Sequence, residues 1–320
     1  MKIHQPFVAI IGAGQVGATS AQRILEKGIS DVVLFDVVPG MPQGKALDLM
    51  QASAIEGHDR RIMGTNDYQD IRGAEIVVVT AGLPRKPGMS REDLLGLNAK
   101  IIREVCVNIK TQAPNAKIIV VTNPLDVMTY LAYKVTGFPS NRVFGMAGVL
   151  DTARMRFFIA EKLNLAPKTV EAIVLGGHGD LMVPVSSHSR IDQKPVKNQI
   201  PPKDLSQIEQ RTRDGGAEIV SLLKTGSAFY APASSVCEMV VAILKDQKKL
   251  LPVCAYLNGA YGLQGIYFGV PAELGKNGIE RVVEISLTDE EKKSLLLSAQ
   301  KVKQGIDEIE RLKLAVGATG

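Results

Sequence analysis

The chain has 320 residues, of which 45% are hydrophobic, enough to bury one large core or two closely packed ones. Intrinsic disorder is therefore excluded as the main state. The 38 Lys and Arg residues against 33 Asp and Glu residues leave a formal net charge of only +5, and with few aromatic residues and no Trp this balance argues against a nucleic-acid-binding surface.

The cysteines and the N-terminus indicate a cellular compartment. Cys106, Cys237 and Cys254 are odd in number, lie in apolar segments and have no Cys-x-x-Cys spacing, which is typical of reduced structural thiols in the cytosol. The N-terminus has neither a signal-peptide cleavage pattern nor a stretch of about 20 apolar residues. We therefore expect a cytoplasmic protein that is neither exported nor inserted in a membrane.

The first predicted unit is a strand, a glycine-rich turn and a helix. The apolar run at residues 7–11 leads into the sequence GAGQVG and then into a helical pattern that ends near residue 28. A lone Gly-x-Gly-x-x-Gly motif is weak evidence, but this one follows a strand and opens a helix. Gly12 allows a tight turn, Gly14 lets the backbone approach a pyrophosphate, and Gly17 lets helix and strand pack closely. The helix N-terminus would face the anion.

A second predicted strand, DVVLFD, ends in Asp36, close to the spacing at which an acid meets an adenosine ribose. The Asp36 carboxylate would accept hydrogen bonds from the ribose hydroxyls and repel a 2′-phosphate. The unit thus predicts binding of NAD in preference to NADP. The alternative role for Asp36 is that of a strand-end cap.

A third predicted strand, residues 75–80, leads into the segment AGLPRKPGMSRED at residues 81–93. Its Gly and Pro residues disfavour regular structure, and Arg85 and Arg91 place two permanent cations on it. We interpret it as a mobile lid that closes over an anion, with a solvated basic loop as the alternative. Upstream, residues 40–46 superficially suggest a phosphate-binding P-loop but lack one spacer residue and the Ser or Thr after Lys45. We therefore expect residues 45–53 to form an ordinary amphipathic helix.

The lid runs into a predicted helix at residues 92–112, in which Asn98 is the polar exception on an apolar stripe. A fourth predicted strand, residues 117–122, ends in Asn123-Pro124. Asn123 presents a donor and an acceptor at the edge of the sheet where ligands bind, although Asn before Pro is often only a turn signal.

The alternating pattern changes near residue 145, and we place a domain boundary there, with an NAD-binding domain at residues 1–146 and a substrate domain at residues 147–320. Residues 147–163 predict a long helix on which Asp151 and Arg154 share a face. A simple ion pair is the alternative reading of these two residues. A strand then leads to GGHGD, where glycines leave room around His178.

The rest of the chain is less informative about function. It predicts a polar excursion at residues 189–205, helices at 208–223 and 234–245, and strands near 250–257, 265–270 and 279–284. Thr288 and Glu291 form a capping box for a final helix that reaches about Leu314. We find no internal repeat and no metal-ligand cluster.

Hydride transfer to or from a bound nicotinamide also requires a base for the hydroxyl proton of the alcohol. Histidine titrates in the required range. His178 is the best candidate, since the other histidines lie in a tail, in a loop and, for His188, in a predicted strand. Asp151 would fix the His178 tautomer if its helix passes beneath the loop. Arg154 would hold a substrate carboxylate through two parallel hydrogen bonds.

Five motifs occur together in the order GAGQVG, AGLPRKPGMSRED, VTNPLD, LDTARMR and GGHGD. In this combination the chain resembles the lactate/malate dehydrogenase family over essentially its whole length. The resemblance implies an α/β protein with an N-terminal NAD-binding Rossmann fold, built on a doubly wound parallel sheet, and a C-terminal α+β catalytic domain. It also implies a homodimer or homotetramer.

The same resemblance implies roles for individual residues. The residues implied to contact the cofactor are Gly12, Ala13, Gly14, Gln15, Val16, Gly17, Asp36, Asn98, Val121, Thr122 and Asn123. His178 would be the proton acceptor, Asp151 its orienting partner, and Arg154 the group that grips the C1 carboxylate of the substrate. Asn123 would hydrogen-bond the reacting oxygen, and Arg91 would polarise the ketone when the lid closes. No metal is implied.

Arg85 would face the variable end of the substrate. Malate dehydrogenases have Arg at this position, where lactate dehydrogenases typically carry Gln. An enclosed Arg pairs with the second carboxylate of malate or oxaloacetate, whereas with pyruvate it would be left desolvated and unpaired. The sequence therefore predicts a dicarboxylate substrate.

Other functions remain as alternatives. The first is an L-lactate or broad 2-hydroxy acid dehydrogenase, and the second is a catalytically silent NAD-binding regulator, which would be expected to lose its His, Asp and Arg set. NAD-dependent glycosidases with a related fold require a metal site, for which the sequence offers no suitable Cys and His arrangement.

Overall fold

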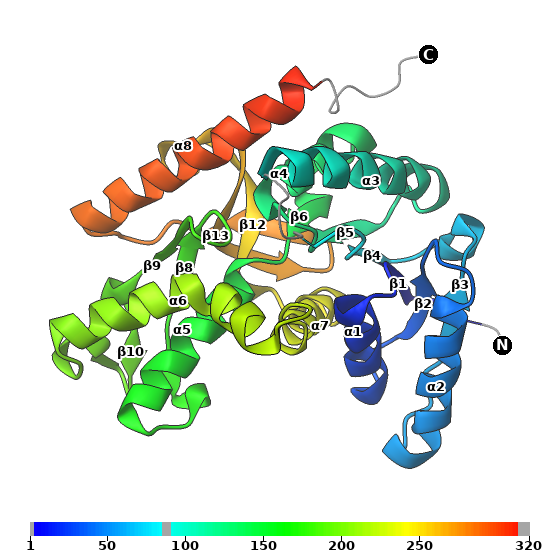
Figure 1. Cartoon of the computed structure of the whole chain (residues 1–320), viewed down its shortest axis with the longest axis horizontal. Helices are drawn as coiled ribbons and strands as arrows, with labels where there is room; N and C mark the ends of the chain where they lie inside the picture. The colour runs from blue at the N-terminus through cyan, green and yellow to red at the C-terminus, as the bar shows by residue number, and fades with distance from the viewer. Residues whose placement is uncertain (1–2, 85–90, 313–320) are drawn as a thin grey trace.

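The computed structural model describes residues 3–84 and 91–312, except for the side chain of Arg91. Its main feature is an eleven-stranded sheet in the order β3-β2-β1-β4-β5-β6-β12-β13-β8-β9, with β14 paired to β13. A small sheet of three strands, β11-β10-β7, lies apart from it. Figure 1 shows the chain passing from the N-terminal strands at one end of the long sheet to the C-terminal strands at the other.

The N-terminal half forms the parallel part of the sheet. Its strands are β1 (Phe7–Ile11), β2 (Asp31–Phe35), β3 (Ile62–Thr65), β4 (Ile76–Val79), β5 (Lys117–Val120) and β6 (Val143–Gly145), and its helices are α1 (Gln15–Glu26), α2 (Met41–Glu56), α3 (Arg91–Gln112) and α4 (Leu125–Thr136). Each neighbouring pair of these strands is parallel. The strand order is that of the dinucleotide-binding Rossmann fold, in which ligands bind at the carboxyl ends of the strands. The predicted Rossmann fold is confirmed.

The C-terminal half adds antiparallel strands and long helices. The strands are β7 (Val170–Glu171), β8 (Val174–Gly176), β9 (Met182–Pro184), β10 (Arg190–Ile191), β11 (Lys194–Pro195), β12 (Lys249–Asn258), β13 (Gln264–Gly275) and β14 (Gly278–Val282), and the helices are α5 (Gly148–Leu163), α6 (Pro202–Leu223), α7 (Tyr230–Leu244) and α8 (Asp289–Arg311). The junction between the halves is an antiparallel pairing of β12 with β6, at Cys254 and Gly145. The sheet therefore continues from one half into the other.

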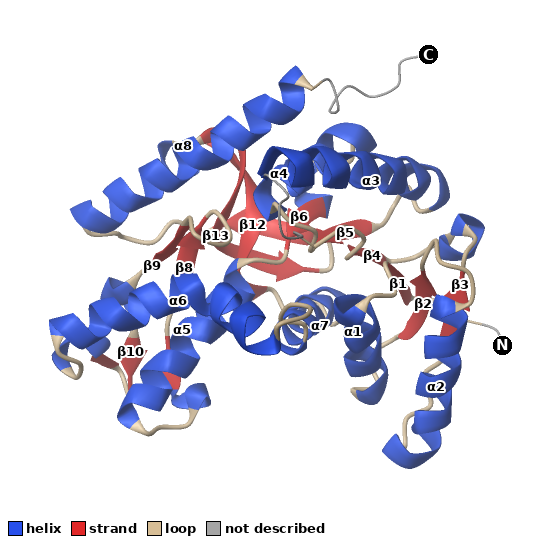
Figure 2. Ribbon diagram, in the orientation of Figure 1, coloured by secondary structure: helices blue, strands red, loops and turns tan. Residues whose placement is uncertain are grey.

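Helices cover both faces of the sheet. Figure 2 shows α3, α4 and α8 on one face and α1, α5, α6 and α7 on the other. Strands buried on both sides are expected to be apolar along their whole length, and every residue of β1 and β4 is indeed buried.

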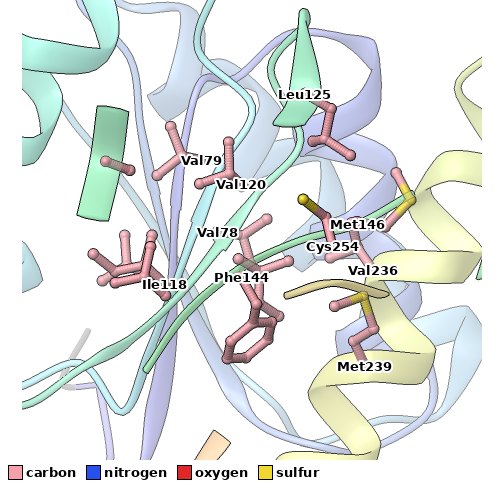
Figure 3. Packing of buried hydrophobic residues seen from close by; sticks show 14 of the residues in the cluster. Val78, Val79, Ile118, Val120, Leu125, Phe144, Met146, Val236, Met239 and Cys254 are labelled. Carbon is pink, nitrogen blue, oxygen red and sulfur yellow. The ribbon is translucent and has the colours of Figure 1, made fainter. Parts of the chain in front are cut away.

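One large hydrophobic cluster spans both halves. In Figure 3, Val78 and Val120 of the parallel strands pack in the same cluster as Val236 and Met239 of α7 and Cys254 of β12. Apolar side chains from both sides of residue 146 are buried in this one core. Separating the two halves would therefore expose them to water. A smaller second cluster lies under α5 and α6.

Most predicted elements are confirmed, including the capping box, in which Thr288 and Glu291 exchange side-chain and backbone hydrogen bonds. Two predictions are wrong in detail, and two strands of the N-terminal half are not predicted. Residues 189–205 are not a plain excursion, because they contain β10, β11 and the start of α6, and His188 lies in a short 3₁₀ helix, not in a strand. The strands β3 and β6 are not predicted at all, since both are too short to show a periodic pattern.

Candidate active site

The glycine-rich turn joins β1 to α1, and its glycines meet different constraints. Gly12 has a φ of +109°, which disfavours any side chain. A Cβ on Gly17 would lie 1.9 Å from the Gly12 carbonyl oxygen, whereas a Cβ on Gly14 would meet nothing within 4 Å. Gly17 is therefore required by packing of the helix on the strand, and Gly14 keeps open the space in front of the helix N-terminus where a pyrophosphate fits. Gln15 and Val16 form the first turn of α1.

Asp36 follows β2 and lies beside this turn. Its carboxylate accepts hydrogen bonds from the backbone N–H of Ala13 at 2.7 Å and of Val38 at 3.0 Å. Asp36 thus acts as the strand-end cap that was its alternative role. It also lines a cavity of about 370 Å³ together with Gly12, Gly14 and Tyr68, so the cap and a contact with a ribose are compatible.

Lys45 of α2 also contacts this turn, and no role was assigned to it from the sequence. Its Nζ donates to the carbonyl of Ala13 at 2.6 Å. The peptide groups on both sides of Ala13 are therefore held by the side chains of Asp36, which follows β2, and of Lys45 on α2. The only signal in the sequence was a Lys close to a Gly-rich segment, and nothing in that pattern predicts its partner.

Asn98, the polar residue on the apolar stripe of α3, is explained by its hydrogen-bond partners. It is buried on α3, its Oδ1 accepts from the backbone N–H of Leu83, and its Nδ2 donates to the carbonyls of Leu83 and, at 2.7 Å, of Asn123. A buried amide is stable only with such partners. Asn98 therefore ties the segment after β4 to the turn after β5.

That second turn contains Val121, Thr122 and Asn123. Thr122 is buried and its hydroxyl donates to the carbonyl of Ala81 at 2.6 Å. The Asn123–Pro124 peptide bond is cis. Asn123 lines a cavity of about 740 Å³ at the carboxyl edge of the parallel strands.

His178 lines the same cavity. It lies in the loop between β8 and β9, and its Nδ1 is 2.9 Å from Oδ2 of Asp151, which is buried on α5. A carboxylate on Nδ1 keeps a proton on that nitrogen and leaves Nε2 as the base. The helix of Asp151 thus passes beneath the histidine loop, as the pairing requires.

Arg154 completes the group on α5. Its guanidinium contacts Oδ1 of Asp151 at 3.2 Å, and its buried Nε has no hydrogen-bond partner in the described part of the protein. Room for this side chain comes from Gly215 and Gly216 of α6, where Cβ atoms would lie 3.2 Å from Arg154 Cδ and 3.5 Å from a guanidinium nitrogen. A glycine pair inside a helix was the signal, which sequence reasoning missed. Arg154 does not line the larger cavity.

Burial and charge act in opposite directions on His178. Burial lowers the pKa of the imidazole, but the charge and hydrogen bond of Asp151 raise it, Arg154 lowers it and Asp126 raises it, with a net pKa above the ordinary value. The imidazolium is thus more stable, relative to the neutral ring, than in an ordinary histidine, which suits a group that accepts the proton of an alcohol.

Some predicted features lie outside this description. Arg85 and the side chain of Arg91 lie outside the described residues. The roles predicted for these two arginines therefore stay predictions. In residues 3–84 and 92–312 no group of three or more His, Cys, Asp or Glu side chains is arranged to hold a metal ion. Within the same residues no helix has both the length and the apolar character needed to cross a membrane.

The comparisons with known proteins agree with this geometry. Residues 7–145 match the model of the lactate/malate dehydrogenase NAD binding domain, and residues 148–313 match that of the lactate/malate dehydrogenase alpha/beta C-terminal domain. A malate dehydrogenase from Synechocystis sp. is 54% identical over 94% of this chain and 93% of its own length.

Two solved structures from Cryptosporidium parvum are also similar. Its malate dehydrogenase is 43% identical, with a TM-score of 0.94, over 96% of this chain and 100% of that one. Its lactate dehydrogenase, complexed with lactic acid and β-nicotinamide adenine dinucleotide, is 41% identical, with a TM-score of 0.93, over 97% of this chain and 99% of that one. The N-terminal half is thus an NAD-binding domain, and the chain belongs to the lactate/malate dehydrogenase family.

Proposed function

We propose that the protein is an NAD-dependent malate dehydrogenase, which interconverts (S)-malate and oxaloacetate by reversible hydride transfer. The observation that carries the proposal is the pairing of His178 with Asp151, in a protein where His178 and Asn123 line one cavity and a dinucleotide-binding turn lines another. A silent NAD-binding regulator would have no reason to keep a buried carboxylate on the histidine ring.

In malate oxidation, Nε2 of His178 takes the hydroxyl proton while Asp151 holds the proton on Nδ1 and stabilises the resulting imidazolium. Bound NAD supplies the hydride acceptor, and its proposed contacts are Gly12 to Gly17, Asp36, Asn98 and Val121 to Asn123. Asn123 hydrogen-bonds the reacting oxygen. In the reverse direction the imidazolium returns its proton to the developing alkoxide.

Arg154 is proposed to bind the C1 carboxylate of the substrate. The buried Nε without a hydrogen-bond partner supports this role, because an unpaired buried donor is costly unless a ligand pairs with it. Arg154 also contacts Asp151, the partner of His178, so its guanidinium lies next to the proposed proton acceptor. Arg91 is proposed to polarise the ketone.

Malate is proposed over lactate because of Arg85, whose cation would pair with the second carboxylate of the substrate. The relatives named malate dehydrogenase support this choice. The overall fold does not distinguish the two substrates, as a lactate dehydrogenase is nearly as similar in structure. An L-lactate or broad 2-hydroxy acid dehydrogenase is therefore the second candidate.

The test is a steady-state comparison of oxaloacetate and pyruvate, each with NADH and NADPH. We expect kcat/KM to favour oxaloacetate by at least about 10³-fold, because pyruvate has no second carboxylate to pair with the cation of Arg85. Arg85→Gln should reduce this ratio by at least about tenfold, whereas Arg85→Lys, which keeps the charge but not the paired hydrogen bonds, should give an intermediate ratio. A preference of the native enzyme for pyruvate would refute the malate assignment.

We further propose a cytoplasmic enzyme of the tricarboxylic acid cycle that forms a homodimer or homotetramer and has no nucleic-acid or membrane partner. The proposed domains are residues 1–146 and 147–320, supported by the two family models, which end and begin on either side of this boundary. Light scattering of the purified protein measures the oligomeric state directly.

A further inference from the structure

A second buried carboxylate lies next to His178. Asp126, in the first turn of α4, is only 5% exposed and lines the cavity that holds His178. Its Oδ2 accepts a hydrogen bond of 2.9 Å from the backbone N–H of His178. The histidine is thus held at its ring by Asp151 of the C-terminal half and at its backbone by Asp126 of the N-terminal half.

The other oxygen of Asp126 is also occupied. Oδ1 accepts a hydrogen bond of 3.3 Å from Sγ of Cys254, a fully buried residue of β12. Burial raises the pKa of the Cys254 thiol well above its ordinary value, so the sulfur keeps its proton and acts as donor. Figure 3 shows Cys254 in the packed cluster with Leu125, the neighbour of Asp126. The carboxylate is therefore fixed between the catalytic loop and the central sheet.

A buried carboxylate of this kind is costly. No lysine or arginine of the described residues forms an ion pair with Asp126. Burial is the largest influence and raises the pKa of its carboxyl group above the ordinary value, although the hydrogen bonds from His178 and Cys254 and the charge of His178 act in the opposite direction. Replacing a buried charge by an apolar group is often neutral or stabilising. A buried carboxyl group is therefore retained beside the histidine at a cost in stability, and the donors on both of its oxygens favour its charged form, which points to a role in the reaction.

We propose that Asp126 is a positioning residue for the reaction, which holds His178 by its backbone and stabilises the imidazolium, and that Cys254 fixes the Asp126 carboxylate for this purpose. The inference rests on the proposed function of His178 as the proton acceptor. Because Asp126 follows Asn123 by only three residues, the same segment that would contact the reacting oxygen also positions the base. The hydrogen bond between Asp126 and His178 thereby fixes the N-terminal half relative to the C-terminal half at the site.

Other charged groups share the surroundings of His178. They are Asp151 and Arg154 on α5, Asp180 in the same loop, and Lys301, Glu308 and Arg311 of α8, which line the cavity. All of these remain in an Asp126→Asn variant, and Arg85 and Arg91 are likewise unchanged in it. A change in the pH profile of that variant therefore reports on the charge of Asp126.

The direction of the change follows from the sign of that charge. Removing a negative charge near His178 lowers the pKa of the imidazole. Malate oxidation requires the neutral ring and oxaloacetate reduction the imidazolium, so the acidic limb of the first and the basic limb of the second should both move to lower pH. For Asp126→Asn we expect a shift of about one pH unit and a roughly tenfold loss of oxaloacetate turnover at pH values above the native pKa of His178.

Ser298→Ala is the matched control for the backbone contact. The Ser298 hydroxyl of α8 accepts a hydrogen bond of 2.9 Å from the N–H of Gly177, the residue before His178. This variant loosens the same loop without changing a charge, so its turnover should fall while both limbs of the pH profile stay in place.

Asp31→Asn controls for the loss of a buried carboxylate elsewhere in the protein. Asp31 accepts hydrogen bonds from the backbone N–H groups of His4 and Arg61. The turnover and pH profile of this variant should be those of the native protein.

Cys254→Ala and Cys254→Ser keep the test valid if Asp126→Asn does not fold. The Ser variant preserves a donor to Asp126 and should retain the native pH profile, whereas the Ala variant removes it and should raise the pKa of Asp126, moving the His178 limbs part of the way to lower pH. Unchanged limbs in both Asp126→Asn and Cys254→Ala, with fluorescence showing intact NADH binding, would overturn the inference. High turnover of His178→Asn would instead overturn the proposed function itself, so the two failures are distinguishable.

Discussion

The glycine-rich turn and the histidine loop lie in the two halves of the same sheet, yet they are built by different means. In the turn, the constraints are mostly steric and local, since Gly17 is required by a carbonyl only a few residues away in sequence. In the loop, His178 is held by Asp126 of α4 and Asp151 of α5, and its neighbour Gly177 by Ser298 of α8. The turn is thus shaped mainly by steric constraints between nearby residues, and the loop mainly by polar side chains from distant segments of the chain.

The difference predicts how each region responds to substitution. A change in the turn should affect cofactor binding, and sometimes stability, before it affects chemistry. A change in the loop should leave cofactor binding intact and alter turnover and its pH dependence. Three variants test this division, from the largest expected effect to the smallest.

His178→Asn should give the largest effect. Loss of the proton acceptor is expected to lower kcat in both directions by about 10³-fold, with NADH affinity unchanged, because the residue contributes to proton transfer and not to the turn. Turnover assays and NADH fluorescence titration measure the two quantities. His188→Asn is the matched control, since His188 contacts the carbonyl of Ser286 on the surface and should retain native turnover. Equal losses in the two variants would contradict the assignment of His178.

Gly17→Ala should give the next largest effect. Its Cβ would meet the Gly12 carbonyl at 1.9 Å, so α1 must shift, and we expect lower thermal stability together with a loss of NADH affinity of about tenfold or more. Gly14→Ala separates the two consequences, since its Cβ meets no protein atom: affinity should fall and stability should not. Gly44→Ala, on α2 with no close neighbour, should affect neither binding nor turnover. Native NADH binding in Gly14→Ala would place the pyrophosphate elsewhere.

Asp36→Ser should give the smallest effect on the reaction. Removing the negative charge reduces repulsion of a 2′-phosphate, and we expect the ratio of kcat/KM for NADH over NADPH to fall by about tenfold, with some loss of NADH affinity because the cap on Ala13 and Val38 is weakened. Oxaloacetate reduction with each cofactor gives the ratio. If the ratio is unchanged, Asp36 serves only as the cap.

Much of the fold follows from local pattern. Continuous apolar runs predict the buried strands β1, β4 and β5, and the Thr288 capping box predicts the start of α8. The strands β3 and β6 escape prediction because four or three residues cannot display a period, and they become strands only where neighbours offer hydrogen bonds. The pairing of β6 with β12 is a contact between segments more than a hundred residues apart, which no local signal specifies.

The candidate site divides in the same way. The sequence by itself determined the residue types and the glycine spacing, because a turn with φ of +109° or a helix packed on a carbonyl excludes side chains wherever the chain goes next. Only the tertiary structure decided that Asp126, Cys254, Ser298 and the Gly215–Gly216 pair surround His178, Asp151 and Arg154. Charges and hydrogen bonds act over a few ångströms in space, and the sequence distance between their partners carries no information about that separation.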